Sequence, residues 1–268
     1  MSINIRQEQA NYEVAIIGAG FAGLGAGIRL KQRGDNSFVI FERAAEVGGT
    51  WRDNTYPGCA CDIPSFLYSY SFEPNPSWSR SFSPQEEILD YLKNCVKKYD
   101  LTSYLRLNTE IIHVQFDKGN GFWRIKDGQG KETTARIVIS AAGPFNAPFI
   151  PEIKGQSSFT GETFHSLTWN HDYDLTNKKV AVIGTGASAI QFVPQIAPMV
   201  KELYVYQRTA PYIAPKMDKE LGAKAKNRFK KYPWYQRFWR EIIYWVLENN
   251  GRSNNGDNKM RAKRKKIA

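Results

Sequence analysis

Apolar residues along the chain form two short units in which a strand, a glycine-rich turn, a helix and a second strand follow one another. The first unit begins with YEVAII (Tyr12–Ile17), carries apolar residues at helical spacing from Gly23 to Arg33, and ends with FVIFE (Phe38–Glu42). The second consists of KVAVIG, a helix through Ile190 to Ile196, and ELYVYQ. Each pattern predicts a βαβ unit with a parallel strand pair and a right-handed crossover.

The remaining segments have other patterns. Residues 48–84 are rich in Gly, Pro, Ser and aromatic residues, which predicts a loop. PQEEILDYLKNCVKKY is amphipathic and predicts a helix with Pro84 at its start. The pattern from Leu105 to Gly143 is extended and predicts a small meander that returns to the sheet. From Lys216 onward the pattern predicts helix rich in aromatic residues, which the polar linker GRSNNGDNK interrupts.

The net charge of +11 is confined to one part of the chain. Residues 216–268 hold sixteen Lys and Arg against five Asp and Glu, a difference equal to the charge of the whole chain. This distribution argues against a nucleic-acid partner. The terminal KMRAKRKKIA is interpreted as a solvated helix face, or a helix without its acidic partners, with a peripheral arm for phosphates or anionic lipid as the alternative.

Membrane, secreted and metal-binding classes find little support in the sequence. No stretch approaches the roughly eighteen apolar residues of a membrane span. The first residues lack the apolar segment of a secretion signal, so we expect a cytoplasmic protein. Three cysteines and three scattered histidines form neither a disulfide framework nor a zinc pattern, and no metal site is predicted.

The first glycine turn, GAGFAG, has the spacing of a dinucleotide-binding turn. Gly18 would form the tight turn, Gly20 would admit a pyrophosphate, and Gly23 would let the helix pack on the strand. Glu42, twenty-four positions after Gly18, ends the second strand. A carboxylate there accepts hydrogen bonds from a ribose diol and repels a 2′-phosphate.

The second turn, GTGASA, is the variant with alanine in the third glycine position (Gly184, Gly186, Ala189). The same count of twenty-four from Gly184 reaches Arg208, with Thr209 beside it. A guanidinium and a hydroxyl in the place of the acid suit the 2′-phosphate of NADP. The pair of turns therefore predicts FAD in the first and NADPH in the second, with hydride transfer from nicotinamide to flavin.

These patterns predict an α/β fold with two Rossmann-like dinucleotide-binding domains of three layers (ββα and αβα), incomplete at the C-terminus. We expect an FAD-binding domain in residues 1–147, a linker with the first part of an NADP-binding domain in 148–215, and a basic, aromatic helical segment in 216–268.

A reduced flavin passes electrons to a disulfide or to oxygen. In disulfide reductases the segment with the redox cysteine pair begins with the sequence GGTC. This chain has Gly49 and Thr50 followed by Trp51, so a tryptophan replaces the first cysteine. Cys59 and Cys61 remain, but a C-x-C pair in a loop more commonly serves packing, and nothing marks either thiol as acidic.

At this point the sequence resembles the class B flavoprotein monooxygenases, and within them the Baeyer-Villiger monooxygenases. Phe159, Gly161, His165 and Trp169 match the family fingerprint F-x-G-x-x-x-H-x-x-x-W, although Asn170 stands where the family has Pro or Asp. The loop GGTWRDNTYPGCACD resembles the family's flavin loop, and the resemblance covers nearly all of residues 12–215.

The resemblance implies that a C4a-peroxyflavin formed from FAD and O2 inserts one oxygen atom into a ketone or aldehyde. Asp62 matches the family's aspartate near flavin and nicotinamide and is the predicted catalytic residue. Fingerprint residues, His165 above all, are expected to couple the two domains rather than to act as a base. The predicted FAD residues are Gly18, Gly20, Phe21, Ala22, Gly23, Glu42, Arg43, Gly49, Thr50, Trp51, Asp62, Tyr68, Ile111, Ala142 and Gly143; the predicted NADP residues are Cys61, Gly184, Thr185, Gly186, Ala187, Ser188, Ala189, Gln191, Arg208 and Thr209.

Two alternatives stay open beside this prediction. Members of the family are roughly twice as long and carry an active-site arginine beyond the helical tail, so the sequence is also compatible with an N-terminal piece of weak flavin affinity. One alternative is an N- or S-oxygenating flavin monooxygenase, and the other is a non-catalytic nucleotide-binding remnant. Substrate and oligomeric state are not predicted.

Overall fold

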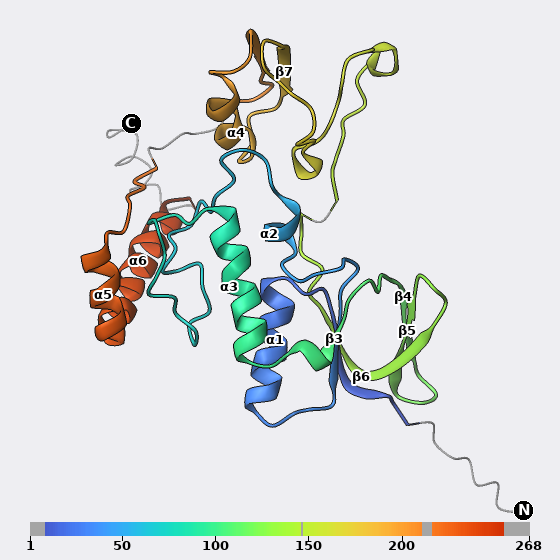
Figure 1. Cartoon of the computed structure of the whole chain (residues 1–268). Coiled ribbons are helices and arrows are strands. Elements are labelled where there is room, and N and C mark those ends of the chain that lie inside the picture. The colour runs from blue at the N-terminus through green and yellow to red at the C-terminus, as the bar shows by residue number, and fades with distance from the viewer. Residues whose placement is uncertain (1–8, 146, 211–215, 255–268) are drawn as a thin grey trace, which may run out of the picture. The chain divides into compact units, whose positions relative to one another are not determined.

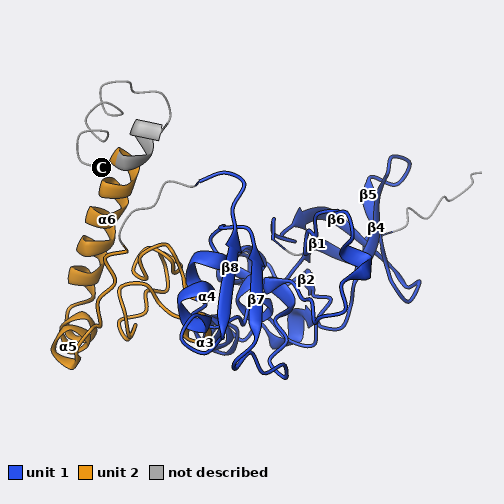
Figure 2. Ribbon diagram, turned by 90° about the horizontal axis from the view of Figure 1, so that it is seen from above, with its two compact units in different colours: residues 1–59, 88–211 blue, residues 60–87, 212–268 orange. Residues whose placement is uncertain are grey.

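The computed structural model describes residues 9–145, 147–210 and 216–254. The chain divides into two compact units, the first formed by Met1–Cys59 with Ile88–Pro211 and the second by Ala60–Glu87 with Tyr212–Ala268 (Figure 2). The first unit holds both predicted dinucleotide turns. The division into an FAD and an NADP domain therefore lies within one unit and stays a prediction.

The first βαβ unit forms as the apolar pattern predicts (Figure 1). Strand β1 (Tyr12–Ile17), helix α1 (Phe21–Gln32) and strand β2 (Phe38–Phe41) follow one another, and β1 pairs with β2 in parallel. All four residues of β2 are buried. Gly27 of α1 lies against Ile40 and Phe38, where an added Cβ would come within 2.7 Å of Ile40 Cδ1, so the helix packs closely on the sheet.

The sheet has six strands in the order β3-β2-β1-β6-β5-β4. The added strands are β3 (Leu105–Arg106), β4 (Ile111–Asp117), β5 (Phe122–Asp127) and β6 (Glu132–Ser140). Strand β6 pairs in antiparallel fashion with β5 over its first half and in parallel with β1 over the rest. The meander thus returns to the sheet as predicted.

The parallel strands lie between two other layers. Helix α1 lies on one face, with α3 (Gln85–Lys98) beside it, and Phe21 of α1 stacks against Tyr91 of α3 at 6.0 Å. On the other face the meander folds back, so that Ile125 and Ala135 share a buried cluster with Ala15, Val39 and Phe41. The predicted ββα layering of the first domain is therefore present.

The second βαβ unit consists of β7 (Lys179–Ile183), α4 (Ala189–Ile196) and β8 (Glu202–Tyr206). The strands pair in parallel as a two-stranded sheet. Val182, Ala189, Phe192 and Ile196 form a buried cluster between helix and sheet. Three single-turn 3-10 helices complete the description: η1 (Thr102–Tyr104), η2 (Gln156–Ser158) and η3 (Ser166–Thr168).

The second compact unit joins the 60–87 segment to the helices α5 (Ala223–Lys231) and α6 (Pro233–Asn254). The Arg240 guanidinium donates hydrogen bonds to the carbonyls of Phe66, Leu67 and Ser69 at 2.6–3.2 Å. Arg80 forms ion pairs with Asp218 and Glu220 at 2.8 and 3.1 Å. These contacts hold the long loop against residues more than a hundred positions away.

Two predictions about local structure were wrong. The predicted loop 48–84 contains a short helix, α2 (Thr50–Asp53), because a single turn leaves no periodicity to read. The predicted break GRSNNGDNK starts too early, since α6 continues to Asn254. Each residue added to a long helix gains a backbone hydrogen bond, which offsets the cost of about 1 kcal/mol for one glycine. The basic terminus 259–268 lies outside the described residues.

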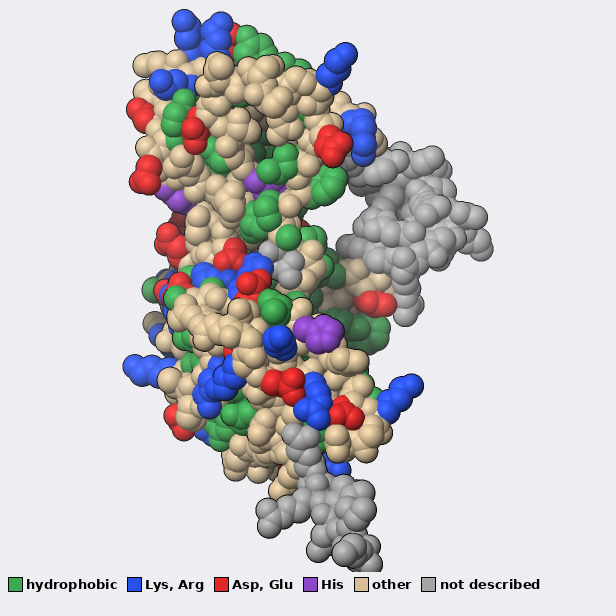
Figure 3. Space-filling model, turned by 90° about the vertical axis from the view of Figure 1, so that its right-hand side faces the viewer, with side chains coloured by type: hydrophobic (Ala, Val, Ile, Leu, Met, Phe, Trp, Pro, Cys, Tyr) green, Lys and Arg blue, Asp and Glu red, His purple; other side chains and the backbone are tan. Residues whose placement is uncertain are grey.

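Charges on the face shown in Figure 3 are mixed: Lys and Arg side chains alternate with Asp and Glu. Ion pairs of the described residues include those of Arg124 with Asp117 and Glu132, at 2.9 and 2.7 Å. Within the described part of the chain, no helix has the length and apolar character needed to cross a membrane.

Candidate functional site

The first glycine turn is hydrogen-bonded at the carboxyl end of the parallel strands. The Gly18 N–H donates to the Phe41 carbonyl at 2.7 Å, and the Gly48 N–H donates to the Ala19 carbonyl at 3.0 Å. Helix α1 then begins at Phe21, with Ala22 and Gly23 in its first turn. No side chain caps this N-terminus and no acid lies in the first turn. The positive end of the helix dipole is therefore suited to an anion.

The glycines of this turn differ in what keeps them small. A Cβ on Gly18 would lie 2.5 Å from the Ala141 carbonyl oxygen, and a Cβ on Gly23 would lie 1.8 Å from the Gly18 carbonyl oxygen. By contrast, a Cβ on Gly20 would meet only Gly49 Cα, at an ordinary 3.8 Å. The protein's own packing excludes side chains at Gly18 and Gly23 but leaves room at Gly20. The small residue at Gly20 thus fits a ligand that approaches the backbone.

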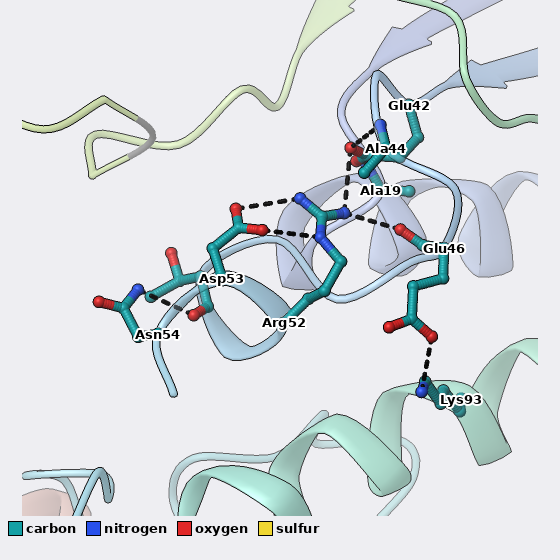
Figure 4. A network of polar contacts seen from close by, with 9 residues as sticks. Ala19, Glu42, Ala44, Glu46, Arg52, Asp53, Asn54 and Lys93 are labelled. Carbon is teal, nitrogen blue, oxygen red and sulfur yellow. Dashed lines mark hydrogen bonds and ion pairs between the residues drawn. The ribbon is translucent and has the colours of Figure 1, made fainter. Parts of the chain in front are cut away.

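Glu42 reaches back to this turn from the end of β2 (Figure 4). Its Oε2 accepts a hydrogen bond from the Ala19 N–H at 2.9 Å, and its Oε1 accepts one from the Ala44 N–H at 3.0 Å. Arg52 donates to the same Oε1 at 3.1 Å. Glu42 is only 5% exposed, so the acid predicted to bind a ribose lies at the glycine turn and is held there by hydrogen bonds from Ala19, Ala44 and Arg52.

Arg52 belongs to α2 and was not selected from the sequence. Besides Glu42, it pairs with Asp53 through two hydrogen bonds of 2.7 and 3.0 Å and donates to the Glu46 carbonyl at 2.7 Å. Burial alone would lower the pKa of the Arg52 guanidinium, but Asp53 and Glu42 outweigh it and raise this pKa above its usual value. Arg52 stays cationic and neutralises the buried carboxylate.

Other residues predicted for FAD fall into two groups. In the first unit, Arg43 follows Glu42, a Cβ on Gly49 would lie 3.2 Å from Gly20 Cα, and Ala142 with Gly143 follow the end of β6. Thr50 and Trp51 open α2, and Ile111 packs against the cluster beneath the sheet. Asp62 and Tyr68, together with Cys61 from the NADP set, belong to the second unit. Asp62 is exposed there.

The second glycine turn repeats the first in backbone geometry. The Gly184 N–H donates to the Tyr206 carbonyl at 2.9 Å, as Gly18 does to Phe41. Helix α4 follows Ser188, with Ala189 as its first residue and Gln191 in its first turn, and it has neither a side-chain cap nor an acid in that turn. A Cβ on Gly186 would meet nothing within 4 Å. This turn, which also includes Thr185 and Ala187, therefore has room for a phosphate group at a helix N-terminus.

Strand pairing changes the residue that is equivalent to Glu42. Ile17 pairs with Phe41 in the first βαβ unit, and Ile183 pairs with Tyr206 in the second βαβ unit. The residue after β8, Gln207, therefore holds the position that Glu42 holds after β2. The equal sequence count to Arg208 was misleading, because the second crossover is one residue shorter.

Arg208 and Thr209 lie next to this position and are exposed. Among the described residues Arg208 has no hydrogen bond or ion pair, while Gln207 Nε2 donates to Thr185 Oγ1 at 3.0 Å. A neutral amide thus lies in the second βαβ unit where the first βαβ unit has an acid, and a cation follows it. The predicted role of Arg208 and Thr209 in phosphate binding stays a prediction.

The fingerprint residues take unequal parts. The centroid of the Trp169 ring lies 5.1 Å from the ring centroid of Phe192 in α4 and 5.2 Å from that of Phe164. His165 caps η3, where its Nδ1 accepts a hydrogen bond from the Leu167 N–H at 3.1 Å. Phe159 is 65% exposed, and its ring lies so close to Gly161 that a Cβ there would come within 2.5 Å of Phe159 Cζ. In this structure Trp169 makes the long-range contact, and the contact of His165 is local.

Residues that the sequence analysis did not select connect the flavin loop to the second βαβ unit. His171 Nε2 lies 2.8 Å from Thr55 Oγ1. Tyr56 is buried, and its ring forms a T-shaped pair with the ring of Phe192, with the two ring centroids 6.0 Å apart. Gly58, at φ +75°, lies so close to α4 that a Cβ would come within 2.8 Å of the Gln195 side chain. A pattern of polar loop residues carries no signal of such contacts.

All three cysteines are free and buried. Burial raises the pKa of the Cys61 thiol to about 11 and also raises the pKa of Cys59. Neutral, buried thiols are poor nucleophiles at neutral pH, which agrees with the sequence argument against a redox pair. No cluster of three or more His, Cys, Asp or Glu that could hold a metal occurs in the described residues.

Comparison with known proteins identifies the family. Residues 15–237 match the family described as pyridine nucleotide-disulphide oxidoreductase, and the chain belongs to it. The chain is 51% identical over 236 residues to a Baeyer-Villiger monooxygenase of Pseudomonas aeruginosa, a match that covers 88% of this chain and 45% of that protein.

Solved structures give the same result. An oxidized steroid monooxygenase bound to NADP is similar with a TM-score of 0.76 and 38% identity, over 83% of this chain and 43% of that one. A complex of OTEMO with FAD and NADP has a TM-score of 0.77 and 33% identity, over 85% and 45% of the two chains. These similarities confirm the predicted resemblance and fold class. The chain spans about half the length of the curated relatives that it matches.

Proposed function

We propose that this chain binds FAD at the first glycine turn and NADP(H) at the second, as part of a Baeyer-Villiger type monooxygenase. The observation that carries the proposal is a difference between two equivalent positions, each directly after the second strand of a βαβ unit. Buried Glu42 follows β2, whereas neutral Gln207, with exposed Arg208 after it, follows β8. An acid suits a free ribose diol, and a cation suits a 2′-phosphate.

Each residue then has a defined task. Glu42 would accept hydrogen bonds from ribose hydroxyls while Arg52 neutralises its charge. The first turns of α1 and α4 would receive the pyrophosphates, and Arg208 with Thr209 would hold the 2′-phosphate. Bound FAD would supply the chemistry of O2 reduction and transfer of one oxygen atom to a ketone or aldehyde. Asp62 is proposed to act near the flavin and nicotinamide, on the family resemblance alone.

Similar proteins support the proposal. One similar structure is described as a complex with FAD and NADP, and curated relatives are named Baeyer-Villiger monooxygenases. A small carbonyl compound and O2 as partners, and a cytoplasmic location, belong to the same proposal.

An anaerobic absorbance spectrum tests it. The purified chain, with FAD added, should show a flavin spectrum that is altered by binding and that bleaches when NADPH is added without oxygen. A chain that neither binds FAD nor bleaches it would instead support the alternative of a non-catalytic nucleotide-binding protein.

A second measurement separates the oxygenation reactions. When a ketone and a thioether are supplied in parallel with NADPH and O2, a Baeyer-Villiger enzyme converts the ketone to an ester or lactone. Conversion of the thioether with no ester would favour the N- or S-oxygenating alternative, in which a nucleophilic substrate is attacked.

A further inference from the structure

Gln207 and Glu42 occupy the same place in two equivalent turns, and both side chains point to the residue after the first glycine. Glu42 Oε2 accepts from the Ala19 N–H at 2.9 Å, and Gln207 Nε2 donates to Thr185 Oγ1 at 3.0 Å. Ala19 follows Gly18, and Thr185 follows Gly184. The two side chains have nearly the same length and differ chiefly in charge.

The surroundings of the two side chains differ as well. Glu42 is buried and receives Arg52, whereas Gln207 is exposed beside Arg208. Neither the second turn, residues 183–189, nor the end of β8, residues 204–210, contains an acid, and Arg208 is the one charged residue in those two segments. A carboxylate at Gln207 would therefore be a new negative charge at the mouth of the turn, next to that cation.

We propose that Gln207 determines which nucleotide the second turn accepts. It does so because it is neutral at the position that is equivalent to Glu42 in the first turn. This inference rests on the proposed function, because it assumes that a nucleotide ribose lies at this edge. The Gln207 amide holds Thr185 as Glu42 holds Ala19, but it neither repels a 2′-phosphate nor neutralises Arg208. Arg208 supplies the attraction, and Gln207 keeps that attraction effective.

The test is the Gln207→Glu substitution, with 2′,5′-ADP and ADP as the probes, titrated by calorimetry. Wild type should bind 2′,5′-ADP more tightly than ADP. Gln207→Glu should weaken 2′,5′-ADP binding by about tenfold or more, since like charges a few ångströms apart repel. Binding of ADP should stay unchanged or become tighter, because a carboxylate accepts hydrogen bonds from a ribose diol.

Two control variants isolate the charge. Gln207→Ala removes the amide without adding charge and should keep the preference for 2′,5′-ADP. Gln129→Glu makes the same chemical change at an exposed position in the turn between β5 and β6 and should leave both affinities unchanged. Because Gln207 is exposed, the variants should fold, which circular dichroism checks.

The outcomes separate this inference from the proposed function. A wild type without preference for 2′,5′-ADP would overturn both. A wild type with that preference, retained in full by Gln207→Glu, would overturn the role of Gln207 alone. An equal loss of preference in Gln207→Ala and Gln207→Glu would also overturn it, since charge would then not be the cause.

Discussion

The buried Glu42–Arg52 pair gives the first prediction at the scale of single residues. Replacing Arg52 by Met leaves a carboxylate of 6% side-chain exposure with backbone donors but without this cation. Removing one partner of a buried pair strands the other charge, so Arg52→Met should lower the free energy of unfolding by about 2–4 kcal/mol. Urea denaturation measures this change.

Two further variants check the cause. The pair of Lys93 and Glu46 is exposed on both sides, at 42% and 48%, so Lys93→Met should cost less than about 1 kcal/mol. The double variant Arg52→Met with Glu42→Gln should regain much of the loss, because no buried charge remains. Additive losses in the double variant would contradict the role given to charge.

Cys61 gives a prediction about pH. Its thiol pKa is raised to about 11 by burial, whereas the same thiol in the unfolded chain loses its proton near pH 8.5. Between these values the folded state holds more protons than the unfolded state, so stability must fall as pH rises from about 8.5 to 11. The loss amounts to about 1–3 kcal/mol.

The matched variant is Cys61→Ala, because other groups also titrate in this range. Unfolding free energies measured from pH 8 to 11 should fall more steeply for wild type than for Cys61→Ala. Identical slopes would mean that the Cys61 thiol is not held neutral in the folded protein.

What the sequence could predict about residues depended on local spacing. The GAGFAG turn and Glu42 follow a regular pattern, and the structure brings them together. Arg52 and His171 carry no such pattern, since their partners are chosen by tertiary contacts. The offset from Gly184 to Arg208 was misread for a related reason: a one-residue difference in crossover length is invisible until strand pairing is known.

At the scale of elements, the glycines of the first turn predict two different failures. Gly23→Ala puts a Cβ 1.8 Å from the Gly18 carbonyl oxygen, and the strand-to-helix junction must shift. The expected loss is about 3 kcal/mol or more in unfolding free energy, the magnitude of severe overpacking. Thermal unfolding measures it.

Gly20→Ala should behave differently, because its Cβ meets only Gly49 Cα at 3.8 Å. Stability should change by no more than about 1 kcal/mol, the cost of a poorer helix N-cap. FAD affinity, followed by flavin fluorescence, should nevertheless fall at least about tenfold, since the backbone can no longer approach the pyrophosphate. Unchanged affinity would place the pyrophosphate elsewhere.

Strands and longer helices were predictable because burial on one or both faces forces a regular apolar pattern. β1, β2, β7 and β8 follow the predicted runs closely. Helix α2 was not predicted because it has a single turn, whose ends are determined by the glycines before it and by Asn54. The Asn54 Nδ2 donates to the Thr50 carbonyl at 2.9 Å. The end of α6 was not predicted correctly, because the helix continues into a polar, glycine-containing sequence that is typical of a loop.

At the scale of the whole molecule, the packing of segments distant in sequence was beyond prediction. Residues 60–84 belong to the predicted loop 48–84 of the first domain, yet Arg240 and Asp218 hold this segment in a unit with the C-terminal helices. Such contacts arise from single polar side chains, which donate to backbone carbonyls in the case of Arg240 and form an ion pair with Arg80 in the case of Asp218. Single polar residues have no periodicity.

The two glycine turns of the first unit are connected by the loop that follows α2. Asp53 pairs with Arg52, Thr55 contacts His171, and Tyr56 packs against Phe192 of α4. If the proposed cofactors bind, ordering of this loop by FAD should favour NADP+ binding, and linkage requires the reverse effect to be equal. We expect FAD to tighten NADP+ binding by at least about fivefold.

Thr55→Val tests this coupling because it keeps the shape of the side chain and removes only the hydroxyl that contacts His171. NADP+ titrations with and without FAD should show a smaller coupling in Thr55→Val, with the affinity for FAD alone little changed. The matched control is Thr163→Val, whose hydroxyl makes a local contact with the Gly161 carbonyl and which should keep the full coupling. Since reciprocity is a thermodynamic requirement, FAD titrations with and without NADP+ must give the same factor. A coupling that survives Thr55→Val undiminished would show that this contact does not transmit it.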